Sequence, residues 1–263
     1  MTTHLRTARE GAVLRLTLND TATRNSLSET MMAELQSALD DAEGDHAIGA
    51  IIISAAGDVF SSGHNLKQLT AHRADADKGE AYFASLFATC ARLMTSIARH
   101  RSAVIAEVDG LASAAGCQLV ATCDLAYGSS RAGFCTPGVN IGLFCSTPMV
   151  ALSRNVPAKQ AMEMLLTGDV MNADFAARAG LLNAIVPQNE LTAHVSALAQ
   201  RIAGKSQSAI AYGKRAFHEQ RAMPLEDAYA FTATVMTRNM LDGAACEGLD
   251  AFISKRKPHW PPL

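Results

Sequence analysis

The sequence is poor in the features that mark nucleic-acid-binding proteins. Aromatic residues make up only 5% of its 263 residues, so few rings are present for stacking on single-stranded bases. Lysine and arginine number 23 against 25 aspartate and glutamate residues, which gives a formal net charge of −2, and the longest basic run is Lys255-Arg256-Lys257. Nucleic-acid binders carry a large basic patch. We therefore predict no nucleic-acid partner.

The sequence also lacks the spacings of disulfide, redox and metal motifs. It has no C-x-x-C and no histidine pair at metal-ligand spacing. We therefore expect no metal and predict that the cysteines are reduced and mostly buried. They are Cys90, Cys117, Cys123, Cys135, Cys145 and Cys246.

No segment reads as a membrane span or a targeting peptide. The longest uncharged run, residues 132–153, is interrupted by Pro137, Gly138, Gly142 and Pro148, which break helices. We expect it to be a buried, irregular segment and predict no membrane partner. Residues 1–10 are polar and show no secretory or transit signature, so we predict a cytoplasmic protein.

Hydrophobic patterns predict an α/β fold in two parts. In the first part, buried or half-buried strands alternate with helices; the predicted strands are 12–18, 48–54, 103–108, 125–127 and 184–186, and the predicted helices include 28–43, a stretch ending near 101, 158–166 and 173–180. From about residue 190 only helical patterns follow, at 190–203, 207–220, 225–240 and 244–255. This order indicates an α/β core followed by a helical region.

Two segments place small residues at the entry to a helix, at 61–65 and 110–116. The first N–H groups of a helix have no partner within it, and the helix dipole favours negative charge there. Small side chains let a ligand approach this backbone closely. Two such N–H groups converging on one point would form an oxyanion hole. Tight packing of helix on strand explains the same residues equally well, and the spacing leaves both interpretations open.

Four ordered motifs resemble the crotonase (enoyl-CoA hydratase/isomerase) family. Residues 59–69 (VFSSGHNLKQL) are similar to its F-x-x-G-x-D-[LI]-K-x-[LM] signature. Residues 108–119 (VDGLASAAGCQL) resemble V-x-G-x-A-x-G-G-G-x-E-L, and residues 123–126 (CDLA) resemble C-D-[IL]-x. Residues 134–143 (FCTPGVNIGL) stand where the family has F-x-x-P-E-x-x-x-G. The resemblance extends over essentially the whole chain.

The resemblance implies a fold, a ligand and an assembly. The fold is a crotonase/Clp-type spiral of ββα units that binds acyl-CoA, expected over residues 1–200, with a helical trimerisation region over 201–263. The implied assembly is a homotrimer or a dimer of trimers. Coenzyme A enters as part of the substrate, and no other cofactor is implied. The region after residue 190 has more apolar helix faces than a small region could bury alone, so we expect subunit contacts from about residue 200 onward. These faces carry Leu191, Val195, Leu198, Phe231, Val235 and Met236.

The resemblance also assigns site residues. The thioester oxygen is expected between the main-chain N–H groups of His64 and Ala115. The segment formed by His64, Asn65, Leu66 and Lys67 matches the family segment that lines the CoA and acyl pocket.

The chain departs from the family where proton transfer is expected. Hydratases of the family use two glutamates, a pairing suited to general acid–base work. The matching positions here hold Gln118 and Gly138, and Ser146 stands where the dienoyl-CoA isomerases have an aspartate. Residues 60–69 and 136–148 resemble a subgroup that carries the family name without the glutamate pair.

Three functions therefore stay open. The first is an enoyl-CoA hydratase/isomerase-like enzyme of fatty-acid metabolism that uses the oxyanion hole. The second is a non-catalytic acyl-CoA binder or regulator, which the loss of both glutamates favours. The third is a serine hydrolase of Clp type with Ser113 as nucleophile. It is disfavoured because no histidine, the base such a serine needs, occurs between His100 and His194.

Overall fold

Two β-sheets form the centre of the computed structural model, which describes residues 3–261. The larger sheet has the order β1-β2-β3-β5-β7-β10, with β1 (Leu5–Glu10), β2 (Val13–Leu18), β3 (Ala50–Ala55), β5 (Ala103–Val108), β7 (Leu125–Gly128) and β10 (Ala184–Ile185). The smaller sheet has the order β4-β6-β8-β9, with β4 (Val59–Ser61), β6 (Leu111–Ser113), β8 (Gly133–Cys135) and β9 (Met171–Asn172). The predicted strands all exist within one or two residues at each end; β1 and the short strands of the smaller sheet were missed.

A repeated unit links the two sheets. Strand β3 lies in the larger sheet and β4 in the smaller one, and the pairs β5–β6 and β7–β8 repeat this step. Strands β3, β5 and β7 pair in parallel, as do β4, β6 and β8, and helices follow each pair. This arrangement is the ββα spiral that the sequence resemblance implied, and it confirms the predicted fold class.

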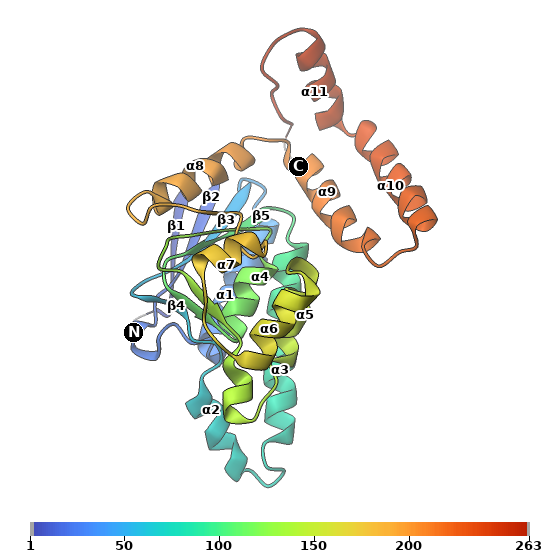
Figure 1. Cartoon of the computed structure of the whole chain (residues 1–263). Helices are drawn as coiled ribbons and strands as arrows, with labels where there is room; N and C mark the ends of the chain where they lie inside the picture. The colour runs from blue at the N-terminus through green and yellow to red at the C-terminus, as the bar shows by residue number, and fades with distance from the viewer. Residues whose placement is uncertain (1–2, 262–263) are drawn as a thin grey trace.

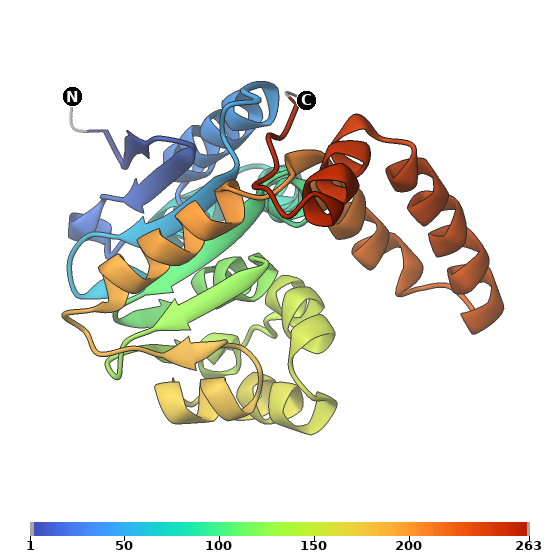
Figure 2. The ribbon, with the colours of Figure 1, turned by 90° about the horizontal axis from the view of Figure 1, so that it is seen from above.

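Helices cover the sheets and extend beyond them (Figures 1 and 2). The longer ones are α1 (Glu29–Gly44), α3 (Glu80–Arg99), α4 (Ala115–Thr122), α5 (Ser146–Asn155), α6 (Ala158–Thr167), α8 (Leu191–Ala203), α9 (Gln207–Gln220), α10 (Leu225–Met240) and α11 (Gly243–Ile253). The short ones are α2 (Leu66–Ala71), α7 (Ala173–Arg178) and the 3-10 turns η1 (Thr21–Thr23), η2 (His72–Ala74) and η3 (Pro137–Ile141).

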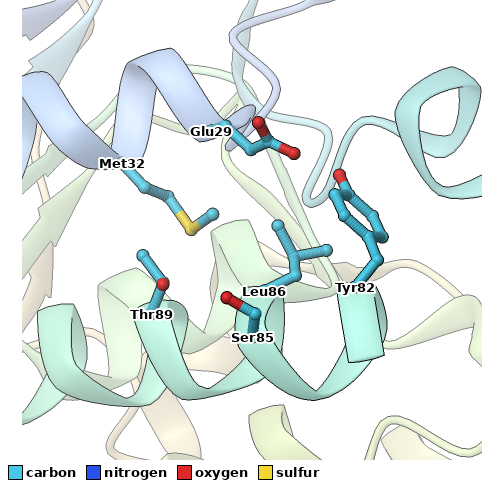
Figure 3. Close-up of a pocket in the computed structure, with 6 residues that line it drawn as sticks. All are labelled: Glu29, Met32, Tyr82, Ser85, Leu86 and Thr89. Atoms are coloured by element: carbon cyan, nitrogen blue, oxygen red, sulfur yellow. The ribbon is translucent and has the colours of Figure 1, made fainter. Parts of the chain in front are cut away.

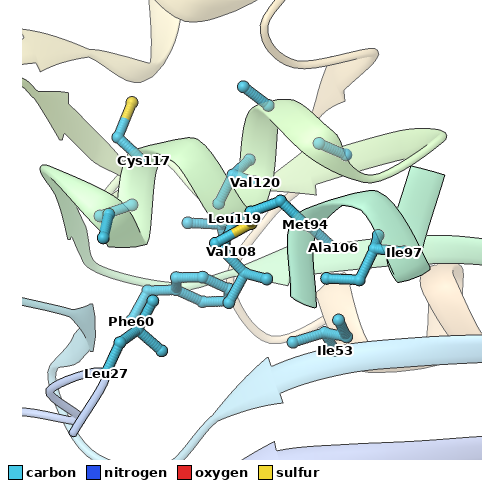
Figure 4. Close-up of a cluster of buried hydrophobic side chains, with 14 of the residues drawn as sticks. Leu27, Ile53, Phe60, Met94, Ile97, Ala106, Val108, Cys117, Leu119 and Val120 are labelled. Atoms are coloured by element: carbon cyan, nitrogen blue, oxygen red, sulfur yellow. The ribbon is translucent and has the colours of Figure 1, made fainter. Parts of the chain in front are cut away.

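The core lies on both faces of the larger sheet because successive side chains of a strand point to opposite faces. Ile51 and Ile53 of β3 face the main core, which includes buried residues of α1, α3 and α4 (Figure 4). Ile52 faces α8, where Leu191 and Val195 are buried. The apolar side of α8 is therefore covered within this chain by the larger sheet.

Helix α3 is long and apolar enough, by length and composition, to cross a membrane. Its apolar face, however, is part of the protein core: Leu86, Cys90, Leu93 and Ile97 are buried there. The core position explains the composition of the helix.

The prediction of an irregular segment at 132–153 was wrong. It holds β8, η3 and most of α5. Pro137 is the first residue of η3, and Pro148 lies in the first turn of α5, where a missing N–H costs no helical hydrogen bond. Gly142, with φ of +78°, ends η3. Pro137, Gly142 and Pro148, which argue against one long helix, therefore lie at or near the ends of two short helices.

Helices α9, α10 and α11 project away from the sheets (Figures 1 and 2). They carry large apolar side chains that this chain leaves exposed. The exposed fraction is 80% for Leu241 and 83% for Phe252. The predicted strand-free region after residue 190 is confirmed as helical.

Candidate functional site

The two predicted small-residue segments lie side by side. Strands β4 and β6 pair in parallel, so the segments that follow them leave the same edge of the smaller sheet. The N–H of Leu27, just before α1, donates to the carbonyl of Gly63 at 2.8 Å and holds the first segment in place. The topology thus brings His64 and Ala115 together although 51 residues separate them in the sequence.

Glycines make this close approach possible. Gly63 has φ of +84°, and a Cβ there would lie 2.9 Å from the carbonyl oxygen of Ser113 and 3.2 Å from the nitrogen of Ala115. A Cβ on Gly116 would lie 2.6 Å from the carbonyl oxygen of Ser61. Tight packing of backbone against backbone therefore explains both glycines, and Gly63 also lies beside the Ala115 N–H.

The main-chain N–H groups of His64 and Ala115 are unused within residues 3–261. Neither donates a hydrogen bond to another residue, although neighbouring groups do; the N–H of Ala114 donates to the carbonyl of Cys135 at 2.9 Å. Ala114 has φ of 50° and ψ of −115°, a conformation outside the helix, and α4 begins at the next residue. Two free donors therefore lie beside Gly63, and free main-chain donors are one requirement of an oxyanion hole.

The side chain of His64 is held in the neutral form. Burial lowers its pKa below the usual value of 6.5. Its Nδ1 lies 3.4 Å from the carbonyl oxygen of Leu27, and its ring packs edge-on against Phe87 of α3 with centroids 5.7 Å apart. The Nε2 atom is buried and has no hydrogen-bond partner among residues 3–261.

The next three predicted site residues begin α2. The Asn65 side chain caps this helix by accepting from the N–H groups of Lys67 and Gln68. Leu66 and Lys67 are exposed. The structure therefore places this segment at the surface beside His64.

Gln118 lies one helical turn beyond Ala115. It is 4% exposed, and its Oε1 lies 4.0 Å from the thiol of Cys90 on α3. It lines a cavity of about 390 Å³ between α3, α4, α5 and α9. The amide carries no charge and exchanges no proton near neutral pH, so this cavity lacks a carboxylate at the position where the family has one.

Gly138 is enclosed rather than open. A Cβ there would lie 2.8 Å from the carbonyl oxygen of Leu143 and 2.9 Å from Sγ of Cys145. Gly138 does not line the cavity beside Gln118. Its φ lies outside the left-handed region, so the obstacle to a side chain is the neighbouring carbonyl and thiol.

Buried thiols near this position do not replace the missing acids. Burial raises the pKa of Cys117, Cys135 and Cys145, so all three stay protonated at neutral pH. Ser146 is exposed at the start of α5 and its hydroxyl lies 3.4 Å from the carbonyl of Phe144. Over residues 3–261, no cluster of three or more His, Cys, Asp or Glu side chains is placed to hold a metal ion.

The serine-hydrolase interpretation finds no triad. Ser113 is buried in β6, and its side chain hydrogen-bonds with Cys135. His100 is engaged elsewhere, with Nδ1 accepting from the N–H of Ser102 and Nε2 lying 3.3 Å from the carbonyl of Leu39. The His64 ring faces the Leu27 carbonyl with Nδ1, and no hydrogen bond joins a histidine to Ser113 within residues 3–261. Ser113 therefore has no imidazole base among these residues.

A second hollow lies between α1 and α3 (Figure 3). It measures about 210 Å³, and Glu29 and Tyr82 are among its lining residues. Burial, and then the nearby Glu29 carboxylate, raises the pKa of Tyr82 to about 12. None of the predicted site residues lines this hollow, so it is not the site that the sequence indicated.

Sequence reasoning missed the contribution of α3. Phe87 contacts the His64 ring and Cys90 contacts Gln118. The two residues are three positions apart and so share one helix face. The apolar spacing predicted a helix here, but no sequence motif connects it with residues 64 and 118.

Comparisons with known proteins support the resemblance. The family model for enoyl-CoA hydratase/isomerase matches residues 8–262. A relative from Xenopus laevis, named enoyl-CoA hydratase domain-containing protein 3, mitochondrial, is 48% identical over 251 residues, which cover 95% of this chain and 84% of that protein.

Two solved structures are also similar. Human enoyl Coenzyme A hydratase domain-containing protein 3 gives a TM-score of 0.92 at 43% identity, covering 98% of this chain and 100% of that chain. The enoyl-CoA hydratase from Mycobacterium smegmatis gives 0.91 at 43% identity, covering 98% of each chain.

The predicted cytoplasmic location is contradicted by these relatives. The proteins from Xenopus laevis, mouse and human are all named mitochondrial. The absence of a leader signature in residues 1–10 did not decide the compartment. The fold, the four motifs and the match over residues 8–262 together lead to one conclusion: the chain belongs to the enoyl-CoA hydratase/isomerase family.

Proposed function

We propose that this protein binds acyl-CoA thioesters, with the thioester oxygen on the main-chain N–H groups of His64 and Ala115. The observation that carries the proposal is that both groups are free of protein acceptors within residues 3–261 and lie together beside Gly63. Coenzyme A is part of the ligand, and the exposed segment Asn65, Leu66 and Lys67 lines its entrance.

The two donors stabilise negative charge on the thioester oxygen. When a carbonyl becomes enolate-like, its oxygen gains charge, and each preorganised donor contributes roughly 2.7–4 kcal/mol to that state. The neutral His64 ring adds no charge near the oxygen. The site therefore supports the charge-stabilising half of enoyl-CoA chemistry.

The proton-transfer half is weak. We take the cavity of about 390 Å³ beside Gln118 as the acyl cavity. Gln118 lines it as an uncharged amide, and Gly138 is closed off by the Leu143 carbonyl and the Cys145 thiol. We therefore propose an enzyme of hydratase/isomerase type with little hydratase activity. A non-catalytic acyl-CoA binder or regulator is the second candidate, and the enclosed Gly138 favours it.

One experiment separates these candidates. The protein is incubated with a panel of acyl- and enoyl-CoA esters, binding is followed by calorimetry, and products are identified by mass spectrometry. Binding with slow double-bond hydration or migration supports the enzyme, whereas binding without any product supports the regulator. An absence of binding at millimolar ester would overturn both.

We further propose that residues 1–200 form the acyl-CoA-binding core and residues 201–263 a trimerisation region. The exposed apolar side chains of α10 and α11, such as Leu241 and Phe252, support this assembly, because isolated soluble chains rarely expose so large an apolar surface. Light scattering at micromolar concentration should show a trimer or a dimer of trimers. The double variant Leu241→Ser, Phe252→Ser should be monomeric, and Leu166→Ser on α6, which replaces another exposed leucine, should not change the mass. A monomeric wild type would refute the assembly.

A further inference from the structure

The cavity beside Gln118 ends in a group of cationic side chains. Arg99 of α3, Arg154 of α5 and Arg221, which follows α9, all line it, together with His218. No aspartate or glutamate is among the lining residues. Three arginines thus line one cavity that has no lining carboxylate, a composition that favours an anion.

These three guanidinium groups have no carboxylate partner within residues 3–261. Within residues 3–261 the Arg99 side chain has no hydrogen bond or ion pair, Arg154 donates to the carbonyl of Val150 in its own helix, and Arg221 donates to the carbonyl of Arg154. Arg221 also lies over the Phe217 ring, 5.6 Å from its centroid. Other arginines of the chain do have acidic partners, such as Arg15 with Glu107 at 2.7 Å.

The acids nearest this group are already engaged. Asp124 accepts from the Lys214 ammonium at 2.6 Å and from the N–H of Val104 at 2.7 Å. Glu219, which lines a neighbouring hollow with Arg99 and His218, pairs with Arg215 at 2.8 Å. The positive charge at the cavity is therefore not neutralised by these neighbours.

The cavity is lined at one place by Gln118, three residues after Ala115, and at another by the arginines. Along α3, Phe87 contacts His64, Cys90 contacts Gln118, and Arg99 is the last residue of the helix. From Ala91 to Arg99 a helix rises roughly 12 Å. The rest of the lining is apolar, with Ala91, Met94, Ala98, Ala121, Val150 and Ala151, and polar without charge, with Thr95, Thr122, Thr147 and Asn155.

Helix α4 also connects the Ala115 N–H with the cavity. Its N-terminus holds the Ala115 N–H, and Ala121 and Thr122 at its other end line the cavity. With its coenzyme A part on the side of His64 and α2, an acyl chain that enters this cavity would extend toward the arginines. A passage lined by apolar and uncharged polar side chains, with a cationic end, matches an acyl chain of medium length that carries a second, terminal carboxylate.

We propose that the acyl cavity is specific for dicarboxylic acyl-CoA thioesters, with the terminal carboxylate bound by Arg99, Arg154 and Arg221. This inference rests on the proposed thioester site. It adds a substrate class that the oxyanion donors themselves do not select.

Calorimetry with two ligands of equal chain length tests the inference. Octanoyl-CoA has an apolar end, and suberyl-CoA, the monothioester of octanedioic acid, has a carboxylate end. We expect wild type to bind suberyl-CoA about tenfold or more tightly than octanoyl-CoA, because hydrogen bonds to charged groups are strong. Arg99→Gln, Arg154→Gln and Arg221→Gln should each reduce that preference, and the triple variant should abolish it without weakening octanoyl-CoA binding.

The control is Arg178→Gln, which removes an exposed arginine from the last turn of α7, away from the cavity. It should keep the preference. Equal affinities in wild type, or a preference that survives the triple variant, would overturn the inference while leaving the thioester site intact. If the arginine variants weaken the binding of free coenzyme A and of octanoyl-CoA to the same extent, the arginines bind the phosphates of coenzyme A. That result also overturns the inference. Failure of both esters to bind wild type would refute the thioester site itself.

Discussion

The two sides of the candidate site differ in the chemical groups that they present. On one side, the ends of β4 and β6 present the free N–H groups of His64 and Ala115 beside Gly63. On the other side, Gln118 is an uncharged amide, and Gly138 is enclosed by Leu143 and Cys145. The first side depends on backbone geometry and the second on side-chain chemistry. The proposed site therefore predicts that binding and proton transfer can be separated in this fold.

The largest effect is expected on the donor side, which is formed by the main-chain N–H groups of His64 and Ala115. Gly63→Ala places a Cβ 3.2 Å from the Ala115 nitrogen at φ of +84°. Because this change displaces one donor, we expect acyl-CoA binding and any turnover to fall by about 10²–10³-fold. Calorimetry measures the loss, with circular dichroism as a check on folding. Gly44→Ala is the control, since a Cβ there meets nothing within 4 Å; similar affinity in both variants would contradict the role of Gly63.

The second prediction tests whether Gly138 leaves room for a side chain. Gly138→Glu should lower the free energy of unfolding by about 1–3 kcal/mol, because its Cβ would press on the Leu143 carbonyl and the Cys145 thiol. Adding Cys145→Ala should restore part of the loss by removing one of the two obstacles. Urea denaturation provides the comparison. A Gly138→Glu protein as stable as wild type would show that room for a carboxylate exists.

A smaller effect is expected at Gln118, which lines the cavity. Gln118→Glu returns one carboxylate to the cavity and should raise crotonyl-CoA hydration by about tenfold or less, since catalytic groups that act as a unit are not additive. Gln200→Glu, at an exposed glutamine of α8 that does not line this cavity, is a matched control. A gain of several orders of magnitude from Gln118→Glu alone would mean that a second proton-transfer group is already in place.

The smallest effect tests whether the donor side needs the His64 ring. His64→Ala keeps the main-chain N–H, so acyl-CoA affinity should change by no more than about threefold. Burial lowers the pKa of His64, so the folded chain resists a proton that the unfolded chain accepts below pH 6.5. The stability that this neutral ring contributes is therefore present above pH 6.5 and lost as the pH falls.

Denaturation at a series of pH values measures that contribution. His64→Ala should flatten the acid decline by at most about 1.4 kcal/mol per pH unit. His100 and His218, whose pKa values burial also lowers, preserve the rest of the decline. An unchanged pH dependence in His64→Ala would show that the ring is not held neutral by burial.

The sequence predicted the parts of this molecule that depend on local pattern. The continuous β-branched run of β3 predicted a strand buried on both faces, and the small residues around Gly63 and Gly116 predicted close backbone approach. The spiral and the meeting of His64 with Ala115 came from the family resemblance. The ββα repeat itself leaves no repeat in the sequence, because each unit fills its core with different residues.

Other features required the folded chain. Gly138 is enclosed by a carbonyl five residues away, which no residue type signals. Arg99, Arg154 and Arg221 come from three separate helices, so no spacing marks them as one group. The sequence shows that α8 has an apolar face but not that the larger sheet covers it.

The most direct test of the separation between binding and proton transfer is kcat/KM of the wild-type chain for crotonyl-CoA hydration. With the donors in place and both glutamates absent, we expect a value about 10²–10⁴-fold below that of a family member with the glutamate pair, measured in the same assay. Turnover equal to that of such an enzyme would contradict the account, since it would require a proton-transfer group that Gln118 and Gly138 do not provide.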